Sequence, residues 1–154
     1  MQLVHLNSQQ ISNLVSIKPP FLFIDEIKID KSNRSATAKR FLINDEWFFL
    51  CHLPNEMAMP GSLLVEAMLQ TMVALIYTCI EHGVNRSFIT HLNMNIQMQA
   101  KPGDLLELHA VLTSNRMGIT KGEVNVFVGG KKISSGNYQY ASPHLLPNIK
   151  PFTN

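Results

Sequence analysis

The chain has 154 residues, of which 45% are hydrophobic and 16% charged, and its formal net charge is +2. This length suits one domain, residues 1–154, and the apolar content is typical of a globular protein, which argues against a disordered chain. A charge so close to balance, with scattered basic residues, also argues against a nucleic-acid partner. The adjacent pairs Lys39-Arg40 and Lys131-Lys132 are interpreted as solvated surface.

The cysteine content and the N-terminus favour a cytoplasmic protein. Two cysteines, Cys51 and Cys79, are too few for a disulfide framework or a thiolate zinc site, so we expect a reducing compartment. The first ten residues, MQLVHLNSQQ, do not place an apolar run behind a basic segment, so we expect no secretory signal.

The first predicted elements are a short helix and two strands. Residues 8–17 have apolar side chains at helical spacing behind a candidate N-cap at Ser8, and Pro19-Pro20 ends this helix. Residues 21–29 and 35–43 are then predicted to be strands.

A loop and a long apolar helix follow. Polar residues and prolines predict a loop up to Pro60, and the helix begins at Pro60-Gly61-Ser62. We expect it to end near Glu81 or His82, before Gly83.

The apolar part of this helix, residues 63–80, is long enough to suggest a membrane span. It contains Glu66 and Gln70, however, and an ionised aspartate in the centre of a membrane helix costs about 2.5–3.5 kcal/mol. We therefore expect no membrane span, and predict a helix buried in a protein core.

The second half of the chain is predicted to be β structure. The Gly129-Gly130 pair between two alternating runs indicates a hairpin, because both glycines can adopt positive φ. Residues 142–154 are predicted to be an irregular tail rich in proline. One apolar helix with an antiparallel run of strands predicts an α+β fold. The predicted strands of this half cover residues 87–98, 105–115, 119–128 and 131–140.

The junction between the loop and the long helix carries the candidate chemistry. His52 can act as a base near neutral pH. The amides of Gly61 and Ser62 lie at a helix N-terminus, where they can stabilise a carbonyl oxygen that gains negative charge. Glu66 lies about one turn further on. Together these groups suit removal of a proton beside a thioester carbonyl, although a structural histidine and a paired buried glutamate are the alternatives.

The same junction resembles a known family. Residues 52–70 read HLPNEMAMPGSLLVEAMLQ, which resembles the HFPGNPIMPGVLxxEAMAQ motif of the 3-hydroxyacyl-acyl carrier protein dehydratases. The resemblance extends over about residues 18–141. In it, PFLFIDEI is similar to PFLLVDRI, AKRFLINDEWFF to AVKNVTINEPFF, and KPGDLLEL to VPGDQLRL.

The resemblance implies a hotdog fold, in which a curved antiparallel sheet wraps a long central helix. It also implies a homodimer with two active sites at the dimer interface. Further assembly into a trimer of dimers is left open as an alternative. The substrate would be an acyl thioester of acyl carrier protein or coenzyme A. No metal and no other cofactor would be required.

The resemblance also assigns roles to residues. His52 of one chain would remove the α-proton, and Glu66 of the partner chain would help the 3-hydroxyl leave as water. The Gly61 amide, together with Ser62, would polarise the thioester carbonyl, and Gln70 would orient the Glu66 carboxylate.

Two further residues and two other functions stay open. Met59 and Pro60 are candidate substrate contacts, with core filling as the alternative for the methionine. A hotdog acyl thioesterase would use the acidic residue and the helix N-terminus without needing His52. A non-enzymatic acyl-thioester-binding relative is the other alternative, because Gln97-Met98 replaces a basic pair of the family.

Overall fold

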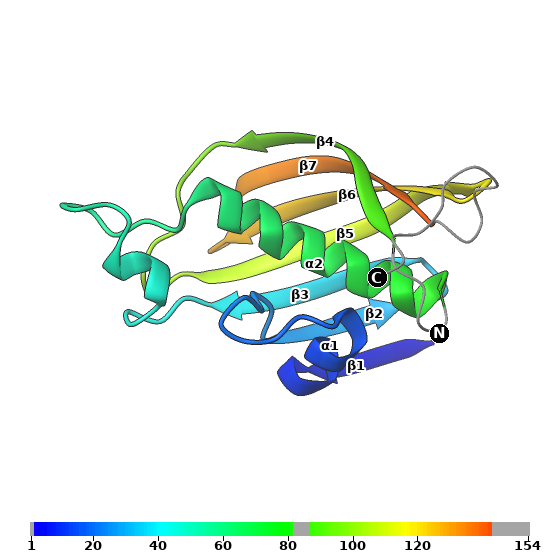
Figure 1. Ribbon diagram of the computed structural model, residues 1–154, viewed down its shortest axis with the longest axis horizontal. Helices are drawn as coiled ribbons and strands as arrows, with labels where there is room; N and C mark the ends of the chain where they lie inside the picture. The colour runs from blue at the N-terminus through cyan, green and yellow to red at the C-terminus, as the bar shows by residue number, and fades with distance from the viewer. Residues whose placement is uncertain (1, 82–86, 143–154) are drawn as a thin grey trace, which may run out of the picture.

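The computed structural model describes residues 2–81 and 87–142, and Figure 1 shows one long helix lying along one face of a sheet. The elements in chain order are β1 (Leu3–Asn7), α1 (Ser8–Val15), β2 (Glu26–Asp30), β3 (Ser35–Phe41), the 3₁₀ turn η1 (Trp47–Leu50), α2 (Gly61–Cys79), β4 (Phe88–Ile96), β5 (Leu105–Arg116), β6 (Ile119–Val128) and β7 (Lys131–Ala141).

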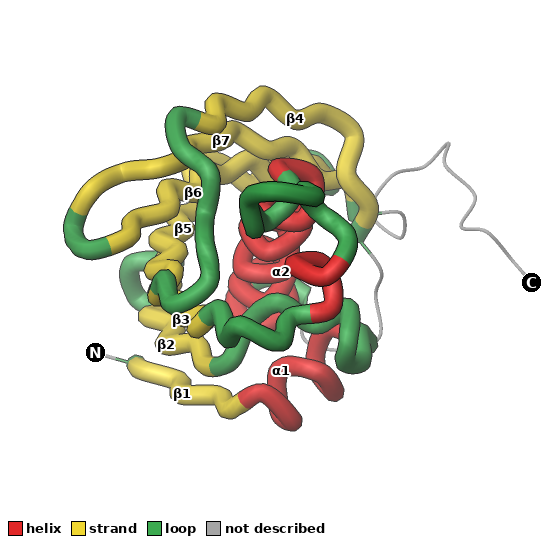
Figure 2. Tube along the Cα trace, turned by 90° about the vertical axis from the view of Figure 1, so that its left-hand side faces the viewer, coloured by secondary structure: helices red, strands yellow, loops and turns green. Residues whose placement is uncertain are grey.

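The seven strands form one antiparallel sheet in the order β1-β2-β3-β5-β6-β7-β4. The strand that follows α2 in the sequence, β4, crosses to the far edge and pairs with β7. The sheet curves around α2, and α1 packs near the opposite edge (Figure 2). This arrangement confirms the predicted α+β class with a helix wrapped by an antiparallel sheet.

The core lies between α2 and the inner face of the sheet. Alternate residues of β5 are buried, as the period of two predicts, and α2 contributes Met68, Met72 and Leu75 with no exposed surface. Full burial of one such side chain stabilises the fold by about 1.5–3 kcal/mol. By length and composition α2 could cross a membrane, but half of its apolar window is buried in this fold, as expected for a core helix.

One glycine sets how closely α2 approaches the sheet. A Cβ at Gly122 in β6 would collide with Met72 Cε and lie 2.8 Å from the carbonyl oxygen of Val111. Because that carbonyl belongs to the backbone of β5, it cannot move aside as a side chain can. Met72 of α2 therefore packs directly against the backbone of β6 at Gly122.

Several predicted turns and strands are confirmed. Gly129 and Gly130 form the β6–β7 hairpin with φ of 56° and 79°. The predicted strand over 35–43 is present as β3, and the last four predicted strands agree with β4 to β7 within a few residues.

The N-terminal prediction needs correction at three points. The cap of α1 is Asn7, whose side chain accepts from the Gln10 amide while the Gln10 side chain accepts from the Asn7 amide. Ser8 is therefore the first helical residue and not the cap. Strand β1 was not predicted, and residues 21–25 are not a strand because part of their backbone bonds to α2 instead.

The predicted end of the long helix is also too late. α2 ends at Cys79, although the amides of Ile80 and Glu81 still donate to the Ile76 carbonyl. The predicted stop at residues 82–83 lies outside the described residues, as does the predicted irregular tail from residue 143 onward.

Candidate active site

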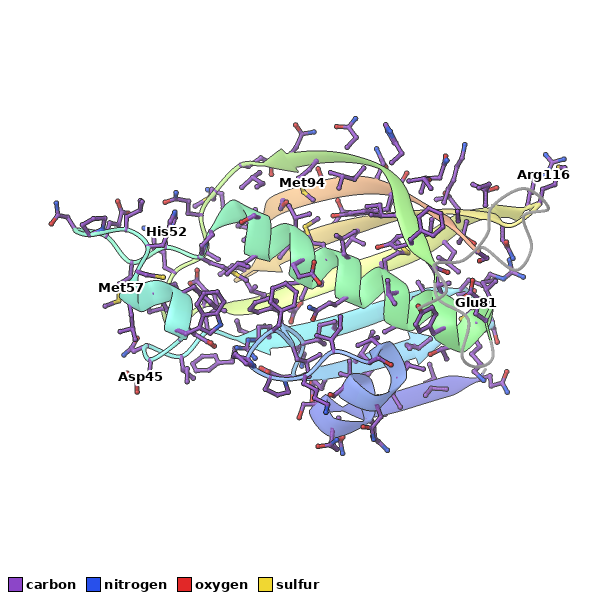
Figure 3. The ribbon with its side chains drawn as sticks, viewed as in Figure 1. Asp45, His52, Met57, Glu81, Met94 and Arg116 are labelled. Carbon is purple, nitrogen blue, oxygen red and sulfur yellow. The ribbon has the colours of Figure 1, made fainter. Side chains whose placement is uncertain are left out.

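His52 lies in the loop beyond the N-terminal end of α2 (Figure 3). Its Nδ1 is 2.9 Å from the Ala58 carbonyl oxygen, and the Ala58 amide donates back to the His52 carbonyl at 3.2 Å. A carbonyl oxygen can only accept, so Nδ1 carries the hydrogen. In the neutral ring Nε2 is then unprotonated, and it has no partner among the described residues. The loop therefore presents a histidine whose outer nitrogen can accept a proton.

The N-terminus of α2 offers unpaired amides. Pro60 is the N-cap position and provides no side-chain cap, while its carbonyl accepts from the Leu63 and Leu64 amides. The amides of Gly61 and Ser62 have no acceptor among the described residues. At the positive end of a 19-residue helix, these two donors can hold an oxyanion.

Gly61 also allows a close approach by the sheet. A Cβ at this position would lie 2.8 Å from Ile96 Cδ1, at the end of β4. The last residue of β4 therefore packs against the start of α2, which places the sheet edge beside the candidate oxyanion site.

Glu66 is held by Gln70, one turn further along α2. The Gln70 side chain is 1% exposed, and its Nε2 donates to Glu66 Oε1 at 3.0 Å and to the Phe21 carbonyl at 2.8 Å. Its Oε1 accepts from the Phe23 amide at 2.8 Å, which fixes the orientation of the amide group. Gln70 therefore bonds to Glu66, and its role in orienting that carboxylate for catalysis stays a prediction. The second Glu66 oxygen has no partner among the described residues.

The predicted site residues extend from the loop before α2 to the middle of that helix, where Gln70 lies. Gly61 and Glu66 are about 7.5 Å apart along the axis of α2, from the helical rise per residue. Over residues 2–81 and 87–142, no hydrogen bond or ion pair joins His52 to Glu66 of the same chain. A single chain thus presents the base and the acid near one helix end without pairing them.

Three predicted substrate contacts differ in exposure. Met59 is 2% exposed and belongs to the core, and its amide donates to the Ala100 carbonyl at 2.8 Å. Pro60 is half-buried and Ser62 is exposed. Contact of these three residues with substrate stays a prediction.

The interpretation of Lys39-Arg40 as solvated surface is wrong for Arg40. Its side chain is 16% exposed and makes ion pairs with Asp25 at 3.0 Å and Glu46 at 2.6 Å. The Lys39 side chain is 40% exposed, and among the described residues its ammonium pairs with exposed Glu26 at 3.5 Å. The sequence held a signal for this difference, because Arg40 shares its strand face with the buried residues Ala36 and Ala38.

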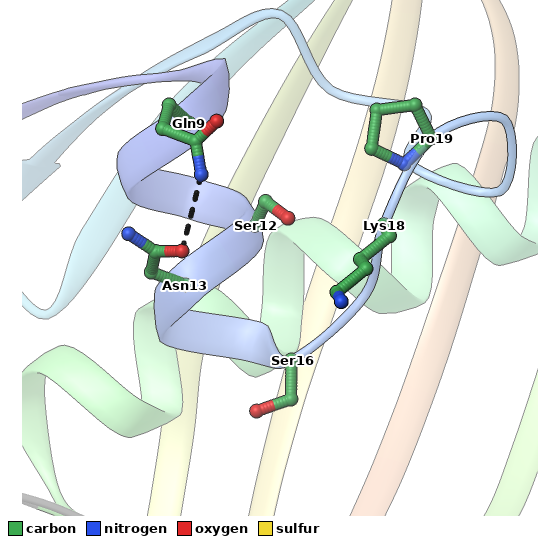
Figure 4. A pocket seen from close by; sticks show the side chains of 6 residues that line it. All are labelled: Gln9, Ser12, Asn13, Ser16, Lys18 and Pro19. Carbon is green, nitrogen blue, oxygen red and sulfur yellow. Dashed lines mark hydrogen bonds between the residues drawn. The ribbon is translucent and has the colours of Figure 1, made fainter.

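Two other features carry no candidate chemistry. No cluster of three histidine, cysteine or acidic side chains in the described part of the chain could hold a metal ion. A hollow of about 480 Å³ beside α1 contains none of the predicted site residues (Figure 4). Its lining residues are Gln9, Ser12, Asn13, Ser16, Lys18 and Pro19.

Residues 16–137 match the FabA-like domain family, so the chain belongs to that family. Among its relatives is the 3-hydroxyacyl-[acyl-carrier-protein] dehydratase FabZ of Acetivibrio thermocellus. The two chains are 32% identical over 138 residues, which cover 88% of this chain and 94% of that protein.

Two solved structures show the same fold. The dehydratase heterocomplex ApeI:P from Xenorhabdus doucetiae contains a chain with a TM-score of 0.71 and 13% identity, covering 86% of this chain and 90% of that chain. A hypothetical thioesterase with coenzyme A from Streptococcus pneumoniae gives a TM-score of 0.59 and 11% identity. The match covers 71% of this chain and 79% of that chain. The chain has the hotdog fold, as the sequence resemblance implied, and this fold is shared by proteins named for different reactions.

Proposed function

We propose that the chain dehydrates 3-hydroxyacyl thioesters of acyl carrier protein to trans-2-enoyl thioesters. The observation that carries this proposal is the likeness to a dehydratase over nearly its full length, together with a histidine whose Nε2 is free to accept a proton. The thioesterase likeness rests on fold alone and does not account for the arrangement of His52.

Each candidate residue has one role in the proposed reaction. His52 Nε2 removes a proton from C2 of the substrate, and the Gly61 amide, with Ser62 beside it, donates to the thioester oxygen as negative charge develops there. Glu66 donates a proton to the 3-hydroxyl, which leaves as water. The C2–H and C3–O bonds break, the C2–C3 double bond forms, and the proton on His52 returns to Glu66 through solvent.

We also propose a homodimer built on β4. This strand is at the edge of the sheet, and its outer edge pairs with no strand among the described residues. Its side chains Phe88, Leu92 and Ile96 are 40–44% exposed, which is unusual for apolar residues of a strand next to a core. A second copy that pairs along this edge would continue the sheet and cover these residues.

Such a dimer would place the second chain beside the N-terminus of α2, because Ile96 contacts Gly61 there. His52 of one chain would then meet Glu66 of the other, which supplies the pairing that a single chain lacks. Light scattering would distinguish this dimer from a monomer and from a trimer of dimers.

We also propose a cellular compartment and a domain extent for the chain. Cys51 and Cys79 are both free thiols, which fits a reducing, cytoplasmic compartment. We take residues 1–154 as one hotdog domain.

The reaction is tested with a two-way assay over a series of acyl lengths. Purified protein receives 3-hydroxyacyl thioesters of acyl carrier protein and, separately, of coenzyme A, and both double-bond absorbance and thiol release are followed. Double-bond formation that requires His52 supports the dehydratase. Thiol release that persists in His52→Ala would identify a thioesterase instead, and bound acyl groups without turnover would indicate a non-enzymatic binding protein.

A further inference from the structure

The segment between α1 and β2 holds Glu66 in place through Gln70. It lies against α2 (Figure 1), where its Phe21 carbonyl and Phe23 amide both bond to the Gln70 side chain. Because Gln70 has no freedom left to rotate, the position of this segment sets the position of the Glu66 carboxylate. The segment ends at Asp25, directly before β2.

A second segment sets the position of His52. The η1 turn begins after Glu46, and the Cys51 amide donates to the Phe48 carbonyl at its end. His52 is the next residue. Any displacement of η1 is therefore passed directly to the backbone that carries the catalytic base.

The Arg40 guanidinium joins the two segments. Nη1 donates to Asp25 at the end of the first segment, and Nη2 donates to Glu46 at the start of η1. Asp25 also accepts from the Phe41 amide, so it is fixed to β3 as well. The Glu46 side chain is 8% exposed, so water screens this ion pair far less than a surface pair.

Aromatic contacts reinforce the same junction. Phe23 of the first segment meets Phe48 of η1 edge-on, with ring centroids 6.1 Å apart, and Phe48 also contacts Trp47 and Phe49. The Trp47 indole donates to the Pro20 carbonyl at 3.4 Å. The two segments therefore form one packed unit with Arg40 as its charged centre.

We propose that Arg40 is a positioning residue for both His52 and Glu66 of its own chain. The Arg40 Nε is buried without a hydrogen-bond partner, an arrangement that lowers stability and so argues against selection for stability alone. The proposal rests on the proposed function. In the proposed dimer, His52 and Glu66 of one chain serve different active sites, so one Arg40 sets the geometry of both sites.

The first test compares Arg40→Gln with Arg40→Lys in the purified dimer. We expect Arg40→Gln to lower kcat by about 10- to 100-fold, since a 1 Å misplacement of a catalytic group can cost about 100-fold, while KM stays within about twofold. Arg40→Lys, which keeps a charge between the carboxylates, should recover most of kcat. Lys39→Gln is the matched control and should leave kcat unchanged, because Lys39 is adjacent to Arg40 but its 40% exposed side chain pairs with Glu26 and not with Asp25 or Glu46.

Stability is followed in the same samples by thermal unfolding. If Arg40→Gln does not fold at the assay temperature, Glu46→Gln asks the same question, since it keeps the shape and an acceptor oxygen but removes the charge. A kcat within twofold of the original protein, or a loss that merely follows the unfolded fraction, would overturn the proposal.

Mixed dimers separate the effects on the base and on the acid. A His52→Ala chain supplies only Glu66 and a Glu66→Gln chain supplies only His52, so their mixed dimer, isolated with two affinity tags, holds one intact site. Arg40→Gln is then placed on either chain. Loss of kcat in both cases supports the proposal, and loss in neither or in only one case refutes it.

The mixed dimers also test the sharing of active sites between chains separately from the role of Arg40. If the mixed dimer without the Arg40 substitution has no activity while the original protein is active, the proposed sharing of sites between chains is wrong. The comparison of Arg40→Gln with Arg40→Lys in the uniform protein then decides the role of Arg40 alone.

Discussion

The two ends of α2 each carry a glutamate, and the two carboxylates are held in different ways. Glu66, near the N-terminus, is half-buried and receives one hydrogen bond from Gln70, with its second oxygen unpaired. Glu81, just beyond the C-terminus, is 3% exposed and accepts from the hydroxyls of Ser87 and Ser142. Figure 3 shows Glu81 at the opposite end of the helix from His52.

This difference distinguishes Glu66, a candidate for catalysis, from Glu81, whose hydrogen bonds stabilise the fold. Glu66 has one oxygen without a partner among the described residues, and it lies about 7.5 Å along the axis of α2 from Gly61, where the helix amides are unpaired. Glu81 uses one oxygen to join the end of the helix to the residue before β4 and the residue after β7. The other Glu81 oxygen is buried and has no partner among the described residues.

The largest expected effect is at the N-terminal end. Glu66→Gln and His52→Ala should each lower kcat by about 10²- to 10⁴-fold, the range expected for loss of general acid or base catalysis. Because neither side chain is fully buried, melting temperatures should change little. Steady-state kinetics and calorimetry check this, and an active Glu66→Gln protein would contradict the role of Glu66.

The second largest effect is expected at the C-terminal end of α2, where a substitution should lower stability and leave kcat unchanged. Glu81→Ala leaves the hydroxyls of Ser87 and Ser142 without their buried acceptor, which should destabilise the fold by about 1–3 kcal/mol. For a chain of this size the melting temperature falls by about 2–4 °C for each kcal/mol. The kcat of the folded protein should be unchanged. Glu123→Ala, which removes an exposed glutamate, is the control and should change neither quantity.

A smaller effect tests the close contact at the start of α2. Gly61→Ala keeps the amide but places a Cβ against Ile96 Cδ1, so kcat should fall by about tenfold, less than the 10²- to 10³-fold expected when an oxyanion donor is lost. Ile96→Val removes that Cδ1 atom, so the double variant should recover activity. A double variant no better than Gly61→Ala would show that the contact is not the cause.

The smallest effect compares the cysteines at the two ends. Cys51 is exposed, while burial raises the pKa of the Cys79 thiol despite the nearby charges of Lys31 and Arg34. A raised pKa leaves less thiolate at pH 8, so iodoacetamide should label Cys79 more slowly than Cys51. Mass spectrometry of the labelled peptides measures the two rates, and equal rates would mean that Cys79 is more accessible than the structure shows.

Much of the candidate site was predictable because its parts are local. His52, Gly61 and Glu66 lie within 15 residues, and helix capping rules place the latter two near one helix end. The contact of Gln70 with Glu66 follows from their spacing of four on one helix. Arg40 was missed because its partners Asp25 and Glu46 lie on different segments, and only the fold brings them together.

The sequence by itself determined the strand alternation, the glycine turns, the long apolar helix and the identity of the catalytic candidates, since these depend on near neighbours. The tertiary structure alone decided which backbone groups would bond to side chains from elsewhere. Residues 21–25 look like a strand by composition, yet the Phe21 carbonyl and the Phe23 amide bond to Gln70, 49 and 47 residues away. The tautomer of His52 likewise depends on which carbonyl lies beside its ring, and only the folded loop supplies Ala58.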